Sequence, residues 1–66
     1  MKRGDIVKTI RSVQLYPEKN SFEFILYPKD YIAIYIADHF FDEIHYSSIL
    51  IDGIIGYVVN KNLKEV

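Results

Sequence analysis

Two histidines and three carboxylates lie close together in the middle of the chain, and these residue types bind metal ions or transfer protons. His39 and His45 are six residues apart, with Asp38, Asp42 and Glu43 beside them. Zinc needs three or four ligands that converge tetrahedrally, often from one rigid element. A separation of six across an expected loop matches no such spacing. We therefore expect a solvated acidic loop and no metal site.

The sequence also shows no residue in a context typical of a catalytic nucleophile. The chain has no cysteine, and the Ser47-Ser48 pair lacks the glycines that surround a nucleophilic serine on a sharp turn. No set of nucleophile, base and orienting residue is evident. With 66 residues there is little room for a pocket that excludes water. We expect no catalytic residue, no cofactor and no enzymatic activity.

Length and charge set further limits. Sixty-six residues make one domain, 1–66, with a small core, and without cysteine no disulfide can stabilise it. The formal charge of −1 gives no general attraction to nucleic acid or to anionic membranes. No apolar run approaches the ~20 residues of a membrane span, and no secretory signal follows the basic start. These features favour a cytoplasmic protein, and the Ile-, Lys-, Tyr- and Asn-rich composition suits an AT-rich bacterial or phage genome.

The positioning elements are expected to be short β-strands. Eleven Ile against two Ala is a strong bias toward β-branched side chains, which favour sheets. Extended segments are predicted at 4–16, 22–27, 31–37, 44–51, 54–59 and 63–66, with turns at 17–21, 28–30 and 60–62. The first of these segments is expected to bend or bulge once. The clearest alternation is in 31–37, where Ile32, Ile34 and Ile36 share one face and Tyr31, Ala33 and Tyr35 the other.

The segment 38–50 admits two interpretations. The first is a loop over 38–43 followed by a strand. The second is a helix capped by Asp38, with Phe41, Ile44, His45 and Ser48 on one face. The β-branched end of the segment and the Asp52-Gly53 pair that follows argue for the strand.

Two glycines interrupt the last apolar stretch, "ILIDGIIGYVVNKNLKEV". Asp52-Gly53 supplies the positive-φ residues of a tight hairpin turn. Gly56 indicates a place where the strand bends sharply or another backbone comes close. Short strands joined by tight turns predict an all-β fold, a small five-stranded barrel.

This C-terminal stretch resembles that of Src-homology-3 (SH3) and bacterial SH3-like domains. In that family a turn glycine, two variable residues, a second glycine, an aromatic and an aliphatic residue precede a single 3₁₀ turn and a closing strand. "VQLY" (13–16) resembles the family's first-strand motif, and "YPKDYIAIY" (27–35) resembles its second strand. The resemblance implies a five-stranded SH3-like barrel with a 3₁₀ turn before its last strand.

The resemblance also implies a peptide-binding shelf, but this chain keeps only part of it. Tyr16 matches the first aromatic position and Tyr46 stands where the family has Trp. Glu18, Val59 and Asn62 replace the remaining Tyr, Pro and Tyr. Because most of the ring area for proline is lost, binding of typical proline-rich peptides is not expected. A cell-wall-binding SH3-like domain usually accompanies a hydrolase and an export signal, and neither is seen here.

The leading hypothesis is a noncatalytic protein-interaction module, of the kind that small bacterial or phage accessory proteins use to dock on host machinery. Exposed Tyr and Phe provide contact area at low entropic cost. Phe40 and Phe41 cannot both turn inward from an extended loop, so one of them is expected to contact a partner or a second copy of the chain. The full set of expected partner-binding residues is Tyr16, Tyr31, Tyr35, Phe40, Phe41 and Tyr46.

The alternative hypothesis is nucleic-acid binding through the two ends of the chain. The first and last strands of such barrels are neighbours, so their basic residues are expected to form one stripe that could contact phosphates. RNA-binding small barrels also begin with a segment similar to Gly4–Val7. The stripe would consist of Lys2, Arg3, Lys8, Arg11, Lys61 and Lys64.

Overall fold

A computed structural model describes residues 1–18 and 22–66, and these fold as β-structure around one apolar core. The seven strands are β1 (Ile6–Thr9), β2 (Val13–Leu15), β3 (Ile25–Tyr27), β4 (Ile32–Phe41), β5 (Ile44–Ile51), β6 (Ile54–Val59) and β7 (Leu63–Glu65). A 3₁₀ turn, η1 (Asn60–Asn62), lies between β6 and β7. The all-β prediction and the 3₁₀ turn before the last strand are confirmed. The expected turn at 17–21 falls partly outside the described residues.

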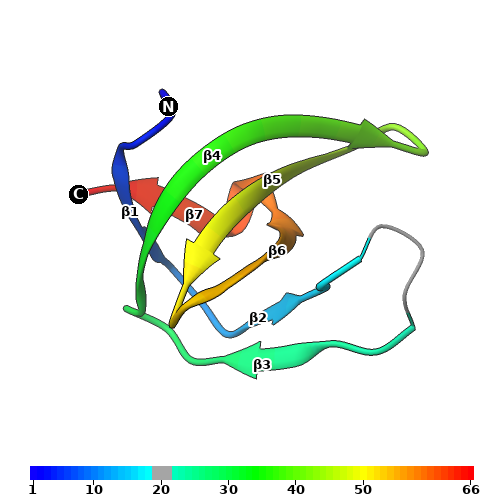
Figure 1. Ribbon diagram of the computed structural model, residues 1–66, viewed down its shortest axis with the longest axis horizontal. Helices are drawn as coiled ribbons and strands as arrows, with labels where there is room; N and C mark the ends of the chain where they lie inside the picture. Colours follow the sequence, from blue (N-terminus) through cyan, green and yellow to red (C-terminus); the bar gives the residue numbers. More distant parts are fainter. Residues whose placement is uncertain (19–21) are drawn as a thin grey trace.

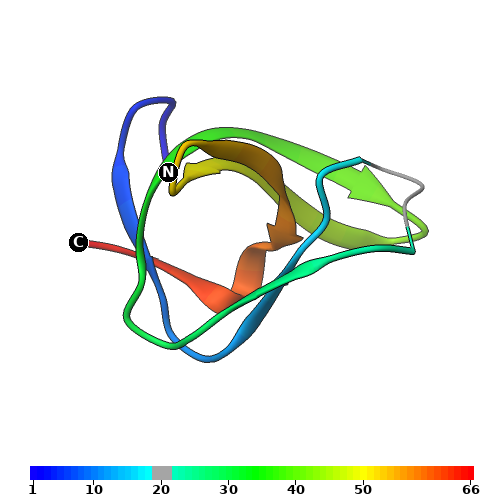
Figure 2. The same ribbon diagram turned by 60° about the horizontal axis from the view of Figure 1, so that its bottom comes forward.

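The strands form two antiparallel sheets. The main sheet has the order β6-β5-β4-β1-β7, and β2 and β3 form a separate pair. Figure 1 shows β4 and β5 as one long hairpin, with the β2–β3 pair below it and the two ends of the chain on the same side. The sheets meet where Tyr16 and Tyr57 exchange backbone hydrogen bonds of 2.9 and 2.8 Å. The main sheet curls (Figure 2), but the two sheets do not close into the single five-stranded barrel that was expected.

The first predicted segment divides as its mixed alternation suggested. Val7 and Thr9 on β1 and Val13 and Leu15 on β2 are all buried, and the chain bends between them at residues 10–12. Thr9 can be buried because its hydroxyl donates to the Pro28 carbonyl at 2.7 Å and accepts from the Tyr31 amide at 2.9 Å. Both ends of this polar side chain are therefore satisfied. The contact also holds the turn between β3 and β4 against β1.

The segment 38–43 is not a loop, and no helix occurs in the described part of 38–50. β4 continues to Phe41, pairs residue by residue with β5, and reverses over Asp42 and Glu43. These two residues have φ of 50° and 67°, the left-handed values of a tight hairpin turn. Asp and Glu give a weaker turn signal than Asn-Gly or Asp-Gly, so the sequence suggested a longer loop. Asp52 and Gly53, with φ of 54° and 76°, make the tight turn predicted between β5 and β6.

Gly56 confirms the expectation of a close approach. A Cβ at this position would lie 2.7 Å from Leu15 Cγ and 3.0 Å from the Tyr16 carbonyl oxygen. Any side chain at this position would force β2 and β6 to shift apart.

The core consists of the apolar side chains that the sheets enclose. It contains Val7, Val13, Leu15, Tyr27, Ala33, Tyr35, Ile49, Ile51, Val58 and Leu63. On β4 it is therefore the Ala33-Tyr35 face that is buried, while Ile32 and Ile34 are exposed.

Candidate functional site

A groove of about 490 Å³ lies where the β2–β3 pair meets the end of the main sheet. Its walls come from β2, β3, β5, β6 and η1, so it gathers residues from both halves of the chain. It is lined by Ser12, Val13, Gln14, Tyr16, Leu26, Tyr46, Val59 and Asn62.

Tyr16 is held in place on one side of the groove. Its backbone is bonded to Tyr57, and its hydroxyl donates to Gln14 Oε1 at 2.7 Å. Its ring lies 5.7 Å from the ring of Phe24 in a tilted arrangement. The ring is half-buried, so one surface of it is fixed and another faces the groove.

Tyr46 also lines the groove. It lies on β5 opposite Val59 of β6, and its ring centroid is 5.6 Å from that of Phe41. The structure thus brings together Tyr16, Tyr46, Val59 and Asn62, four of the five positions that the resemblance assigned to a binding shelf. Glu18, the fifth, is exposed and does not line the groove.

Phe40 and Phe41 project from opposite faces of β4, as their adjacent positions on a strand require. Phe40 is 69% exposed and stacks on His45 with centroids 4.6 Å apart. Phe41 is half-buried and its ring contacts Tyr46 and Tyr57. Phe41 therefore packs against the Tyr46 ring that lines the groove, and Phe40 is the ring that a partner could reach.

The expectation that Tyr35 is a partner-binding residue is wrong. Tyr35 is only 3% exposed, because β4 turns its Ala33-Tyr35 face into the core. Tyr31 is half-buried and packs against that core, with its ring 5.0 Å from Tyr27. A Tyr ring fills more of a small core than Ile does, and its hydroxyl can reach a polar partner at the edge. Tyr35 is therefore a core residue, and Tyr31 packs against the core with part of its side chain exposed.

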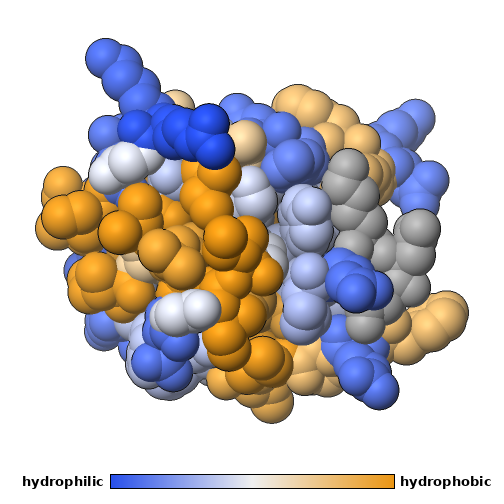
Figure 3. Space-filling model, in the orientation of Figure 1, coloured by the Kyte–Doolittle hydropathy of each residue, from blue (hydrophilic) through white to orange (hydrophobic). Residues whose placement is uncertain are grey.

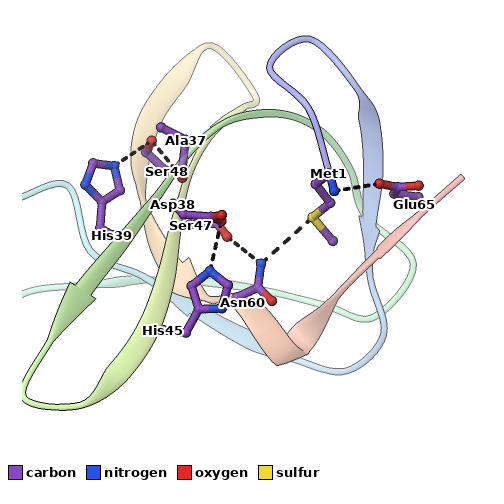
Figure 4. Close-up of polar contacts among 9 residues, drawn as sticks. All are labelled: Met1, Ala37, Asp38, His39, His45, Ser47, Ser48, Asn60 and Glu65. Atoms are coloured by element: carbon purple, nitrogen blue, oxygen red, sulfur yellow. Dashed lines mark hydrogen bonds and ion pairs between the residues drawn. The ribbon is translucent and has the colours of Figure 1, made fainter.

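Asp38 and His45 lie together on one face of the β4–β5 hairpin, next to a second hollow of about 490 Å³. His45 Nε2 lies 2.9 Å from Asp38 Oδ1 as an ion-pair contact (Figure 4). A hydrogen bond from the Tyr35 hydroxyl and, second, the contact with His45 lower the pKa of Asp38. Burial first, and then this hydrogen bond, raise the pKa of Tyr35 to about 12. The three groups tie the hairpin to the core.

His39 lies on the opposite face of the same hairpin, as Figure 4 shows. Its Nε2 is 3.0 Å from Ser48 Oγ, and that hydroxyl also donates to the Ala37 carbonyl at 3.4 Å. Ser48 is only 6% exposed, so a substrate has little access to this serine-histidine pair. Across residues 1–18 and 22–66, no group of three or more His, Cys, Asp or Glu side chains is placed to hold a metal ion.

Strand pairing brings some of the basic residues together. Lys8 of β1 lies directly opposite Lys64 of β7, and the Ile10 amide donates to the Asn62 carbonyl at 2.9 Å. Acidic groups lie among them: Lys8 pairs with Asp30 at 3.7 Å, and the amino group of Met1 pairs with Glu65 at 3.0 Å. Lys2 and Arg3 are exposed and precede the first residue of β1.

Sequence reasoning did not identify the β3 side of the groove. Leu26 is 65% exposed and lines it, and Phe24 packs on Tyr16. The stretch Phe22–Tyr27 is apolar at almost every position, so its pattern does not show which side chains face outward. The described part of the chain contains no helix that could cross a membrane. Comparisons with protein families, with curated proteins and with solved structures find no match for this chain.

Proposed function

We propose that this chain is a noncatalytic, SH3-like interaction module that binds an extended segment of a partner protein in the groove between Tyr16 and Tyr46. The observation that carries the proposal is the convergence of these two rings, thirty residues apart in sequence, with Val59 and Asn62 in one groove. Aromatic side chains that are partly fixed before binding contribute contact area at low entropic cost.

The chemistry of the groove suggests what kind of segment it accepts. Tyr16, Tyr46, Leu26 and Val59 offer apolar surface, and Ser12, Gln14 and Asn62 offer polar groups. With two aromatic walls in place of a full shelf, the groove suits a peptide with one or two apolar anchors better than a proline-rich helix. The partner would be a protein of the host cell if the chain serves a bacterium or phage as a small accessory protein.

Selection from a displayed peptide library, followed by NMR titration of the wild-type chain, tests this proposal. Amide shift changes are expected to centre on residues 12–16, 46 and 59–62. Tyr16→Ala and Tyr46→Ala should each weaken the selected peptide at least ~10-fold, the size of a moderate hot spot. Phe22→Ala is the matched control, because Phe22 is 97% exposed and does not line the groove. Shift changes centred elsewhere would refute the groove as the site.

The alternative function is nucleic-acid binding along the β1–β7 edge, and the Lys8–Lys64 pairing is the observation that favours it. Phosphate contacts release counterions, so such binding weakens steeply with salt. Labelled single- and double-stranded RNA and DNA should then bind at low salt and dissociate at ~200 mM salt. Lys8→Gln with Lys64→Gln should reduce the binding. No binding at low salt eliminates this alternative.

A further inference from the structure

One face of the main sheet carries exposed aliphatic side chains where polar ones are usual. Antiparallel sheets commonly cover one face with a core and turn a polar face to water. Here the outer face opposite the core exposes aliphatic residues with exposed fractions between 36% and 60%. We call this set the aliphatic stripe; it consists of Ile6, Ile32, Ile34, Leu50 and Ile55.

The stripe is contiguous because strand register aligns its members. Ile6 of β1 pairs with Ile34 of β4, Ile34 pairs with Leu50 of β5, and Leu50 pairs with Ile55 of β6. With strands ~4.8 Å apart, this row crosses four strands over ~14 Å. Ile32 extends it along β4, since residues two apart share a face. Figure 3 shows a broad continuous apolar area on the face where these strands lie in Figure 1.

We infer that this stripe is a homodimer interface, in which two copies of the chain pack their main sheets face to face. A partner for the stripe must offer an uncharged aliphatic surface. The stripe itself has that chemistry, and because the main sheet curls, the two copies come closest at the middle of the row, where Ile34 pairs with Leu50. Two sheets can pack at ~10 Å with side chains interleaved, as in a β-sandwich.

The order of residues along the row makes the stripe self-complementary. A two-fold axis parallel to the strands and midway between β4 and β5 places Ile34 against the partner's Leu50, and Ile6 against the partner's Ile55. Every position then meets an aliphatic side chain, as an isologous interface requires.

The charged residues at the two ends of the stripe also fit this two-fold arrangement. Lys8 lies beside Ile32 at the β1 end of the stripe, and Asp52 lies in the turn at the other end, between β5 and β6. The same two-fold axis brings the Lys8 end of one copy to the Asp52 turn of the other. The existing contact of Lys8 with Asp30 is long, at 3.7 Å, and leaves Lys8 40% exposed and able to turn toward a second carboxylate.

The area matches a weak dimer. A protein interface takes about a tenth of a small protein's surface, which for the 4543 Å² of this chain is ~450 Å² per copy. The stripe exposes the equivalent of about two and a half whole aliphatic residues, so it supplies the centre of such an interface and its neighbours the rim. An interface of this small class is expected to dissociate at ~1 µM to ~1 mM.

Sedimentation velocity over ~1 µM to ~1 mM chain tests the inference directly. The wild-type mass is expected to rise with concentration from 7.8 kDa toward twice that value. Ile34→Lys places a charge at the centre of the stripe and should raise the dissociation constant at least tenfold. Ile44→Lys is the matched control, because Ile44 is 44% exposed on β5 but lies at the hairpin end. It should dimerise as the wild type does.

A second measurement keeps the test independent of any variant that fails to fold. In a mixture of isotope-labelled and unlabelled wild-type chains, filtered NOEs are expected between stripe methyl groups of different copies. Ile55→Ser, at a 60% exposed position, should remove them. A chain that stays monomeric at the highest concentration overturns the inference, as does a dimer that Ile44→Lys breaks and Ile34→Lys does not. The latter result would place the contact at the Phe40 hairpin.

Discussion

At the scale of single residues, Gly56 makes the sharpest prediction. A Cβ there would approach Leu15 Cγ to 2.7 Å and Leu15 Cδ1 to 2.9 Å, and Leu15 is fully buried. Overpacking of this kind costs ~1–3 kcal/mol. We expect Gly56→Ala to lower the free energy of unfolding by that amount in urea denaturation.

The second variant in that experiment is Leu15→Ala, which removes the atoms that the new Cβ would meet. In the double variant the two losses should be less than additive, because the clash has gone. Additive losses would show that the contact with Leu15 is not what restricts position 56 to glycine.

The pair Tyr35 and Asp38 makes a prediction about pH. The pKa of Asp38 is lowered mainly by the Tyr35 hydroxyl, so the pair contributes stability above the ordinary Asp pKa of ~3.9, and this is lost as the pH falls through the lower folded value. The pKa of Tyr35 is raised to about 12 in the folded protein. The stability that its protonated hydroxyl contributes is therefore fully present below pH ~10, the ordinary pKa of Tyr, and is lost as the pH rises from ~10 toward 12.

We therefore expect Tyr35→Phe to raise the Asp38 pKa toward its ordinary value, measured by carboxyl ¹³C NMR titration. Unfolding free energy should also fall less steeply between ~pH 10 and ~12 than in the wild type. Tyr46→Phe is the control, because strand alternation places Tyr46 on the other face of the hairpin from Asp38. An unchanged Asp38 pKa in Tyr35→Phe would contradict the assigned hydrogen bond.

At the scale of elements, the β4–β5 hairpin places the adjacent rings of Phe40 and Phe41 in different environments, although nothing in the sequence distinguishes them. Phe40 is 69% exposed, whereas Phe41 is half-buried among Tyr46, Tyr57 and His39. We expect Phe40→Ser to cost less than ~1 kcal/mol of stability and Phe41→Ser to cost ~1–2 kcal/mol, measured in urea. If the hairpin binds a partner, Phe40→Ser alone should abolish that binding. Equal losses of stability would show that both rings are core.

Turn chemistry was the part of these elements that the sequence predicted best. Asp52-Gly53 and the 3₁₀ turn at Asn60–Asn62 require particular backbone geometry, which residue type indicates directly, and Gly56 marks a close approach between strands. The segment 38–43 was mistaken for a loop because both faces of a protruding hairpin meet solvent. Without a buried face there is no clear alternation to signal a strand.

Which face of β4 is buried could not be read from the alternation. A period of two shows that a strand has two faces, but it does not show which of the two meets the core. The structure buries Ala33 and Tyr35, since a small and a large side chain together fit the narrow space against Ile49. The exposed aliphatic stripe, which the sequence did not predict, is the direct consequence.

At the scale of the whole molecule, the groove depends on how two sheets meet, and this explains why only part of it was predicted. The resemblance placed Tyr16 and Tyr46 in one site. Leu26 and Gln14 joined them only through the pairing of β2 with β3 and the Tyr16–Tyr57 bridge. Contacts between sheets are long-range, and no local pattern encodes them.

The same arrangement predicts that stability is not uniform across the molecule. β1, β4 and β5 have a paired strand on both sides, whereas β3 pairs with β2 alone and exposes Ile25 and Leu26. In native-state hydrogen exchange, the bonded amides of β1 and β4 are expected to exchange only through global unfolding, with protection that falls as urea is added. The bonded amides of β3 should exchange through local opening that urea barely affects.

Because Leu26 lines the groove, that opening would let the groove adjust to a partner, and a bound peptide should then protect the β3 amides selectively. If all these strands shared one exchange free energy, the two sheets would instead be one cooperative unit and the groove would be rigid.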